Sequence, residues 1–420
     1  MTAPPPTPSP APATAPSSDL ATAPVPATPR LMRAINERAA LETLLERGPL
    51  SRPELGTLTG LSGPTASQLL GRLRRAGLVI RDGRREGSPG RTADLYRINP
   101  DAAYVCGLDV TPHGIEAAVG GLTGPVIGRF RLPARQSPAN RADLLRRVRA
   151  AVAGACRLAG LDPAELDRVV IGVQGAVDPR SGRLRYAGHL RGWHVPDLTG
   201  TLRSGLGVPV HLENDVNLVA VAERIDGAAR GHDDVVLLWG GPGMGVALMF
   251  GGRLHRGATG CAGEVGHLPV PGAPTAREVS RRAGHGLQAL AGGAAVRAVL
   301  RGHGFRAATA AAAVRAAARA WTDGDDRAEP ALRAVAGRVA TGLAVITALI
   351  DPEVVVLTGE VLLAGGEPLR GLIDDELGPF TVPRPPLRLS ALRGNPVLAG
   401  ALAHARCLTR EELFGSTART

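Results

Sequence analysis

Lysine is absent from this 420-residue chain, so all 49 of its basic side chains are arginine. Aromatic residues make up 3% of the chain, and its four cysteines are scattered without a CxxC pair. This spacing excludes a disulfide-dense module and predicts reduced thiols. No apolar run approaches the roughly 20 residues that a membrane-spanning helix needs. These absences predict a cytoplasmic protein without a membrane anchor, and the length predicts two or three packed units.

The arginines are unevenly distributed along the chain. The formal net charge is +11, and residues 30–100 contain 13 arginines against 7 acidic residues. Over half of the positive surplus therefore lies in about a sixth of the chain. A local excess of positive charge is typical of a module that contacts phosphates. The distribution predicts a polyanionic partner for this segment.

The first 28 residues are nearly all Ala, Pro, Thr and Ser. They have no basic start and no continuous apolar stretch, so a signal peptide is not indicated. Their composition predicts a disordered leader over 1–28. The periodic patterns that follow predict one folded domain over 29–100 and a larger one over 101–410.

The domain over 29–100 opens with two helix signals and a turn. Apolar residues at helical spacing predict a core helix over 31–46. Its apolar residues are Ile35, Ala39, Leu41, Leu44 and Leu45. Ser51 and Glu54 form a capping box that predicts the start of a second helix. Gly60 then allows a tight turn.

A third helix, capped by Ser62, is predicted over 63–76 and presents two faces. Its buried apolar residues are Ala66, Leu69, Leu70 and Leu73. Its outward polar residues are Thr65, Ser67, Gln68 and Arg72. A basic, glycine-rich hairpin follows between the strand segments 78–80 and 94–98. The basic residues that we assign to this wing are Arg84, Arg85 and Arg91.

Helix, short turn, helix and basic hairpin together predict a winged helix-turn-helix that binds double-stranded DNA. The outward residues of the third helix would contact base edges in the major groove. The wing arginines would contact phosphates or the minor groove. Each signal alone also fits an ordinary small helical domain, but their combination with the basic wing favours DNA binding.

From Tyr104 onward, short β-branched or aliphatic runs alternate with longer helical segments. This alternation predicts a mixed α/β architecture with largely buried strands. The predicted strands cover 104–110, 115–122, 169–173, 208–212, 235–239, 245–250 and 354–359.

Polar residues follow two of these strands. Asp109 with nearby Thr111 could orient a magnesium-bound phosphate, or could be a solvated residue at the end of a strand. Asn214 and Asp215 follow the strand over 208–212, where they could recognise sugar hydroxyls, and Asp215 could accept a proton from one. They could equally cap the following helix, and the spacing leaves both interpretations open.

Two further motifs lie downstream. The glycine-rich segment 240–245 could lie against phosphates or simply join a hairpin. Glu264 and His267 are three residues apart, so both could contact one ligand, or each could be an ordinary surface or core residue.

The ordered set of motifs resembles the ROK family of repressors and sugar kinases. The stretches that carry the resemblance are HLENDVNLVAVAERIDGAARG (211–231), GGPGMGVALMFGGRLHRGATGCAGEVGH (240–267) and DPEVVVLTGEV (351–361). Residues 38–79 and 88–100 look like the winged module that repressor members carry and kinase members lack. The resemblance covers about residues 30–410. It implies an N-terminal winged helix-turn-helix followed by a two-lobed, actin-like or ribonuclease-H-like sugar-kinase fold.

The resemblance also implies roles for individual residues. It assigns a sugar pocket to Asn214, Asp215, Glu264 and His267, with Glu278 as a further member. Asp215 would be the catalytic base in a kinase. The remains of an ATP site would include Asp109, Gly243 and Gly359. The resemblance further implies a homodimer or a dimer of dimers, and a C-terminal helix that returns to the first lobe.

The chain departs from the family pattern at several positions. Kinase members have glycines in the turn after the first strand, where Pro112 and His113 stand here, so we expect ATP and magnesium to bind poorly. The family's structural zinc uses the histidine of the GH motif and three nearby cysteines. No cysteine follows His267 in that region, so we expect no zinc and no other cofactor. Gln174 and His189 replace a usual proline and asparagine, so the sugar is expected to be unusual or absent.

The sequence thus predicts a DNA-binding transcriptional regulator without enzymatic activity. We expect a repressor of sugar-metabolism genes that binds operator DNA and responds to a sugar or a sugar phosphate. One alternative is an ATP-dependent sugar kinase with an attached DNA-binding domain, which Asp215 favours and the turn at 112–113 opposes. Another is a DNA-binding protein that ignores sugars and uses its large domain only to dimerise.

Overall fold

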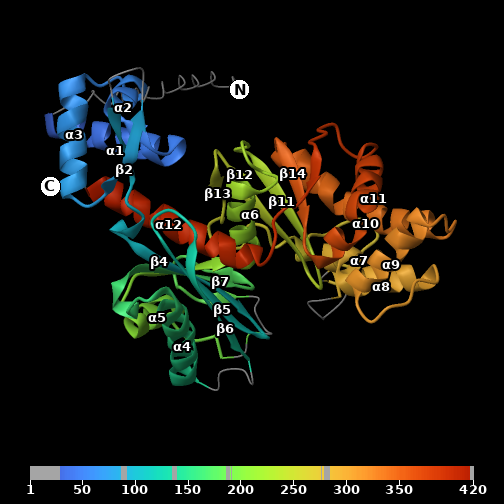
Figure 1. Cartoon of the computed structure of the whole chain (residues 1–420). Helices are drawn as coiled ribbons and strands as arrows, with labels where there is room; N and C mark the ends of the chain where they lie inside the picture. The colour runs from blue at the N-terminus through green and yellow to red at the C-terminus, as the bar shows by residue number, and fades with distance from the viewer. Residues whose placement is uncertain are drawn as a thin grey trace, which may run out of the picture.

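The computed structural model describes residues 29–86, 92–134, 140–185, 190, 192–275, 277–278 and 284–416. Within these ranges the chain forms a winged helix and two larger lobes, each built around a five-stranded sheet (Figure 1). The predicted leader over 1–28, Arg91 and His189 lie outside the described residues. The predicted α/β fold with an N-terminal winged helix is confirmed.

The winged helix packs three helices against a small antiparallel sheet with strand order β1-β3-β2. Its elements are α1 (Pro29–Arg47), β1 (Leu50–Ser51), α2 (Arg52–Thr59), α3 (Gly63–Arg75), β2 (Val79–Glu86) and β3 (Thr92–Ile98). The predicted capping box is present, because the Ser51 hydroxyl accepts from the Glu54 amide while the Glu54 carboxylate accepts from the Ser51 N–H. Gly60 ends α2 in the left-handed conformation with φ 69°.

One part of the core prediction for α1 was wrong. Ile35 is 51% exposed, whereas Ala34, Leu41 and Leu44 are buried. Neighbouring helical residues are about 100° apart, so the face that includes Ala34 points Ile35 to solvent. The pairing of β1 with β3 was also missed, because a two-residue strand carries no periodicity of its own.

The first lobe contains the sheet β10-β7-β4-β5-β6, in which β10, β7 and β4 are parallel and β4, β5 and β6 antiparallel. Its main strands are β4 (Tyr104–Thr111), β5 (Gly114–Gly121), β6 (Val126–Pro133), β7 (Leu166–Val173) and β10 (Val210–Asn214). Helices α4 (Arg141–Ala159) and α5 (Leu198–Leu206) pack on one face of this sheet. A short hairpin of β8 (Ala176–Val177) and β9 (Leu184–Arg185) follows β7.

The second lobe contains the sheet β13-β12-β11-β14-β15. Its strands are β11 (Val235–Gly240), β12 (Met244–Phe250), β13 (Arg253–Leu254), β14 (Val354–Thr358) and β15 (Leu387–Leu389). Its helices are α7 (Gly286–Ala291), α8 (Gly293–Gly302), α9 (Ala310–Thr322), α10 (Ala328–Ile350) and α11 (Glu360–Leu377). Each of the seven strands predicted from the sequence is found, and β6, β8, β9, β13 and β15 were missed because they are short or exposed at an edge.

Helix α10 is long and apolar enough to cross a membrane by length and composition alone. In this fold it packs against α9 and α11, and its Leu332, Val335 and Leu343 lie in the core of the second lobe. The contacts make α10 a core helix of that lobe.

Two helices lie between the lobes, and one of them also reaches the winged helix. Helices α6 (Asp215–Asp226) and α12 (Pro396–Ser416) share an apolar cluster with residues of both large sheets. Helix α12 then continues to the winged helix (Figure 1). There Phe414, 4% exposed, joins the core of the winged helix. One helix thus contacts both the lobes and the winged module.

Candidate functional site

A cavity of about 540 Å³ lies between the two lobes. The parallel strands β4, β7 and β10 bring their carboxyl ends to one edge of the first sheet, where ligands of open α/β folds commonly bind. The second lobe closes the cavity with the β11–β12 turn and the loop over 260–264. The lining residues include Thr111, Pro112, His113, Gln174, Asn214, Asp215, Trp239, Gly243 and Glu264.

Asp215 is the first residue of α6 and lines this cavity. Its Oδ1 accepts the backbone N–H of Val216 at 2.9 Å. Burial, together with the nearby charges of Asp109 and Glu264, raises the pKa of Asp215 to about 7 despite that hydrogen bond. A carboxylate that titrates near neutrality can accept a proton from a bound hydroxyl.

Asp109 lies on β4 two residues before Thr111 of the cavity wall, is 8% exposed and is not itself among the lining residues. Its carboxylate accepts a hydrogen bond from Asn395 Nδ2 at 2.8 Å, and the same nitrogen lies 3.2 Å from Glu116 Oε2. Burial raises the pKa of Asp109 and outweighs the hydrogen bond from Asn395. The structure therefore engages Asp109 with the segment that starts α12, one residue before the helix begins.

Asn214 caps α6, which is one of the two interpretations that the sequence left open. Its Oδ1 accepts from the Asn217 N–H at 3.1 Å, so it caps α6, and its Nδ2 donates to the Gly175 carbonyl at 3.1 Å. It also lines the cavity beside Asp215. β10 ends at Asn214 and α6 begins at Asp215, so the change from strand to helix lies at the cavity wall.

Of the three second-lobe residues that the sequence assigned to a sugar pocket, only Glu264 lines this cavity. Glu264 lines the cavity, and burial raises the pKa of its carboxyl group. His267 is exposed and absent from the wall, because its ring stacks on that of His285, which precedes α7. Glu278 is also exposed, and its carboxylate accepts from the backbone and hydroxyl of Thr275. His267 and Glu278 are therefore not among the described residues that line this cavity, and their contact with a sugar stays a prediction.

The turn after β4 is a two-residue hairpin at the cavity. Pro112 has no N–H, and the His113 N–H donates to Thr111 Oγ1 at 3.2 Å. Neither turn residue therefore has a free amide for a phosphate, which fits the expectation of poor ATP binding.

The segment 240–245 forms the β11–β12 hairpin turn and also lines the cavity. Gln288, which the sequence did not single out, fastens this turn: it accepts from the Met244 N–H and donates to the Pro242 carbonyl, both at 2.9 Å. Gly243 lies on the wall, whereas Gly359 does not and instead caps α11 with φ 89°.

A second candidate surface lies on the winged helix. The predicted base-contacting residues Thr65, Ser67 and Gln68 are all exposed on α3. Arg72 differs from them, because its Nε donates to Glu37 Oε1 of α1 at 2.7 Å. It therefore ties α3 to α1 in this structure.

The wing arginines have acidic partners within the module. Arg84 pairs with Asp94 at 3.3 Å and Arg85 with Glu54 at 2.6 Å. Sequence reasoning missed Arg74 and Arg75, which are exposed in the last turn of α3 and line a hollow of about 440 Å³ together with Arg81. Their position in a helix that ends in basic residues was the available signal.

Comparisons with known proteins agree with both parts of the chain. The profile of the ROK family matches residues 105–377, and that of the MarR family matches residues 35–91. The xylose repressor of Bacillus subtilis (strain 168) is 27% identical over 240 residues, which are 57% of this chain and 61% of the repressor. The match thus spans about three fifths of that relative's length.

Two solved structures resemble the fold. A ROK hexokinase from Thermus thermophilus superposes with a TM-score of 0.61 at 29% identity and covers 73% of this chain and 99% of its own. A ROK family transcriptional regulator, described as a homologue of the Escherichia coli MLC protein, superposes with a TM-score of 0.73 at 20% identity. It covers 92% of this chain and 99% of its own, which extends the shared fold to the N-terminal module.

Proposed function

Because the chain belongs to the ROK family, we propose that it is a transcriptional repressor that binds operator DNA and changes its DNA affinity when a sugar binds. The observation that carries this proposal is the presence of a winged helix and a two-lobed cavity on one chain. Kinases of the family share the lobes, whereas the winged module is typical of a regulator.

The DNA-binding half of the proposal rests on α3 and its surroundings. Thr65, Ser67 and Gln68 offer small polar groups along an exposed face, as major-groove recognition requires. Arg74 and Arg75 extend this face with positive charge that can contact phosphates. Arg84 and Arg85 would exchange their acidic partners for phosphates when the wing meets DNA. Arg72 contacts a base only if it leaves Glu37.

The sugar-binding half rests on the cavity between the lobes. Asp215, Asn214 and Glu264 place two carboxyl groups and one amide where adjacent hydroxyls can bind. Trp239 adds an apolar surface suited to the face of a sugar ring. A small sugar fits a cavity of this size, and xylose is the first candidate because a related repressor is named for it.

Helix α12 connects the two halves. Asn395, just before the helix, contacts Asp109 of β4, while Phe414 near its other end lies in the core of the winged helix. Arg406 and Arg410 fasten the helix to backbone carbonyls of Gly121 and Leu122. A sugar that binds one lobe arrangement better than another would therefore shift the position of the DNA-binding module.

We further propose a homodimer that reads paired half-sites in the cytoplasm, with no cofactor. The four cysteines are free thiols, as expected for a reducing compartment. The family's zinc lacks its donors here, since no cysteine occurs between Cys261 and Cys407 and His267 contacts His285 instead.

The test is selection of genomic fragments with the purified full-length chain, at fixed salt, with and without a panel of sugars and sugar phosphates. Recovery of one palindromic site whose occupancy a single sugar changes is the expected result. Gln68→Ala should weaken that site by about 1–3 kcal/mol, whereas Arg74→Ala should weaken all sequences similarly and reduce the salt dependence. Binding that depends on salt but not on sequence would contradict the proposal.

The kinase alternative has one observation in its favour, the carboxyl group of Asp215 with its pKa of about 7. The turn at 112–113, without a free amide, opposes it. A coupled assay with ATP and a hexose and pentose panel distinguishes the two, because turnover that Asp215→Asn abolishes would require a kinase.

A further inference from the structure

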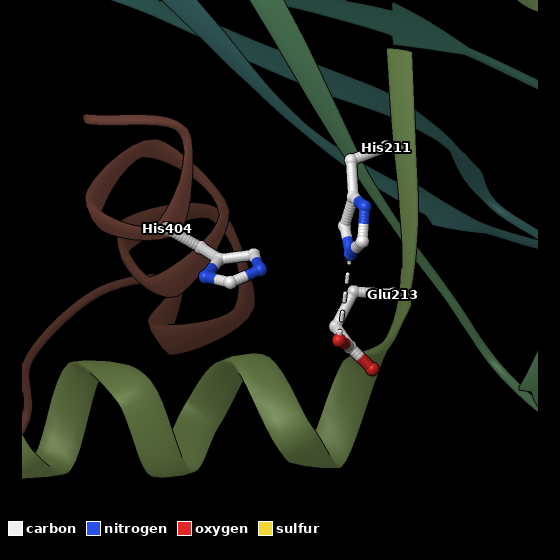
Figure 2. Close-up of side chains that lie close together, drawn as sticks. All are labelled: His211, Glu213 and His404. Atoms are coloured by element: carbon white, nitrogen blue, oxygen red, sulfur yellow. Dashed lines mark ion pairs between the residues drawn. The ribbon is translucent and has the colours of Figure 1, made fainter. Parts of the chain in front are cut away.

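A second cluster of polar residues lies on the other side of the β10–α6 junction from the cavity that Asp215 lines. His211 and Glu213 alternate with buried apolar residues on β10, so their side chains share one face of the strand. His404 of α12 approaches the same point (Figure 2). One ligand atom from each of the three residues lies within 4.8 Å of the other two. Two imidazoles and one carboxylate are the donor set that zinc and similar divalent metals prefer.

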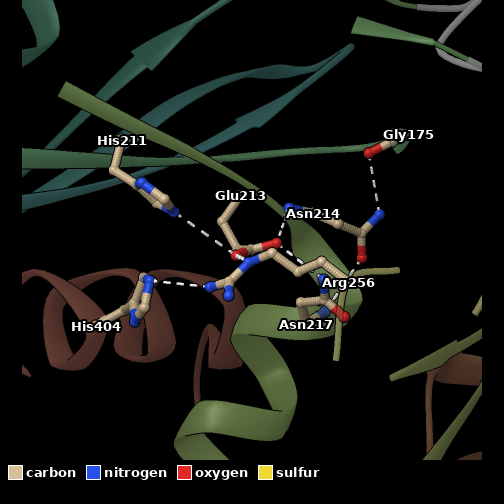
Figure 3. Close-up of polar contacts among 7 residues, drawn as sticks. All are labelled: Gly175, His211, Glu213, Asn214, Asn217, Arg256 and His404. Carbon is tan, nitrogen blue, oxygen red and sulfur yellow. Dashed lines mark hydrogen bonds and ion pairs between the residues drawn. The ribbon is translucent and has the colours of Figure 1, made fainter. Parts of the chain in front are cut away.

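The protein's own cation already occupies the centre of this cluster. Arg256, which follows β13 in the second lobe, donates from Nε to Glu213 Oε2 at 2.6 Å, and its terminal nitrogen lies 3.4 Å from His404 Nε2 (Figure 3). Both acceptor atoms therefore aim their lone pairs at a positive charge. His211 Nε2 is buried, lies 3.7 Å from Glu213 Oε2 and makes no hydrogen bond with the described residues.

We propose that His211, Glu213 and His404 form a binding site for a divalent transition metal such as zinc, and that Arg256 is its built-in competitor. Arg256 and Glu213 also line a cavity of about 520 Å³, which gives the metal a route in and the guanidinium a place to go. Zinc–ligand distances of about 2.0–2.2 Å require the three donors to draw together when the guanidinium leaves. Metal entry would thus replace the ion pair between Glu213 of the first lobe and Arg256 of the second lobe. Arg256 lies on the loop that leads to Glu264.

This site is separate from the family zinc, whose cysteine donors the chain lacks. It also does not depend on the sugar proposal, because none of its three ligands supplies an oxygen or nitrogen to the sugar cavity. A chain that binds no metal could therefore still bind a sugar, and a chain that binds no sugar could still bind a metal.

The test is titration of the chelator-treated, full-length chain with Co²⁺ by visible absorption and with Zn²⁺ by calorimetry. We expect one equivalent to bind with ligand-field bands of a four- or five-coordinate site and without a thiolate charge-transfer band. Loss of a group that only hydrogen-bonds to a metal ligand typically lowers metal affinity about 10- to 100-fold, so His404→Ala, which removes a ligand, should lower it about 100-fold or more. Arg256→Ala should instead tighten binding by about tenfold or more, because it removes the competitor. His303→Ala, at an exposed histidine elsewhere, should change nothing.

Circular dichroism and size-exclusion chromatography establish that each variant folds, and His211→Ala on the edge strand replaces His404→Ala if the latter does not. The gain of affinity in Arg256→Ala is a readout that misfolding cannot produce. Absence of saturable binding in the wild-type chain overturns the proposal, even if Arg256→Ala binds, because Arg256 then closes the site permanently. Binding that survives both histidine substitutions also overturns it.

Discussion

Glu213 and Asp215 are two residues apart at the end of β10, yet their carboxyl groups behave in opposite ways. The pKa of Glu213 is lowered to about 2, and that of Asp215 is raised to about 7. Burial raises the pKa of both groups, so desolvation alone does not explain the difference between them. Glu213 has Arg256, His211 and Asn217 as partners, whereas Asp215 faces the acidic Asp109 and Glu264.

The difference arises from the turn of the chain between the two residues. Asn214 caps α6, so the strand ends and Asp215 starts a helix that points it into the cavity between the lobes. Glu213 remains on the strand and faces α12 and the loop after β13. One junction therefore separates a carboxylate that is paired with a positive charge from a carboxyl group whose pKa is about 7. The first is suited to a cation and the second to a hydroxyl ligand.

The largest effect is expected from removing the partner of Glu213. Arg256→Ala in the metal-free chain should lower the free energy of unfolding by about 2–3 kcal/mol, because a 3% exposed carboxylate loses its counter-charge while the arginine itself was partly solvated. Urea denaturation measures this loss. Arg253→Ala, at an exposed arginine on the adjacent strand β13, is the matched control and should change stability by less than about 0.5 kcal/mol. Equal losses in both variants would show that the ion pair does not set the environment of Glu213.

Asp215→Asn should instead raise the stability of the chain relative to wild type near neutral pH. A raised folded-state pKa stabilises the chain below the ordinary value of 3.8, and that stabilisation is lost as pH rises toward about 7. The asparagine variant has no such loss, so its melting temperature relative to wild type should increase from pH 4 to 7 and stay constant above. Thermal melts of the two proteins in parallel buffers measure this gap. A gap that does not change over this range would mean that Asp215 titrates normally.

The two carboxylates should also separate in ligand binding. Asp215→Asn should weaken the sugar found by operator selection by about 10- to 100-fold, because a hydrogen bond to a charged group is worth about 1.5–3 kcal/mol. Glu213→Gln should leave sugar affinity within about threefold while it abolishes metal binding. Calorimetry on both variants with both ligands measures the four values. Equal loss of sugar affinity in the two variants would show one coupled site rather than two.

The smallest effect is expected at the junction itself. Asn214→Ala removes the cap of α6 and should cost about 1 kcal/mol of stability. Asn140→Ala, at the cap of α4, should cost a similar amount without any change in sugar affinity. Denaturation curves and sugar calorimetry on both variants compare them. If Asn214→Ala leaves sugar affinity unchanged as well, Asn214 acts only as a cap.

Much of the fold followed from local signals. The capping box at Ser51 and Glu54, the left-handed Gly60 and the alternating strands were all predicted, because each depends on residues close together in the chain. The same locality predicted the polar junction at Asn214 and Asp215. It failed at Ile35, where a one-residue shift of the buried face cannot be read from spacing alone. It could not place His267 and Glu278, because their positions depend on the partners that they contact in the folded chain.

The sequence by itself determined the order of helices and strands, the basic winged module and the residue types at the cavity, since periodicity, caps and charge are properties of neighbouring residues. Only the tertiary structure decided that the pKa of Glu213 is lowered to about 2 while that of Asp215 is raised to about 7. It also decided that β10, the loop after β13 and α12 bring His211, Arg256 and His404 to one point. Burial and counter-charges come from segments far apart in the chain, so no local pattern encodes them.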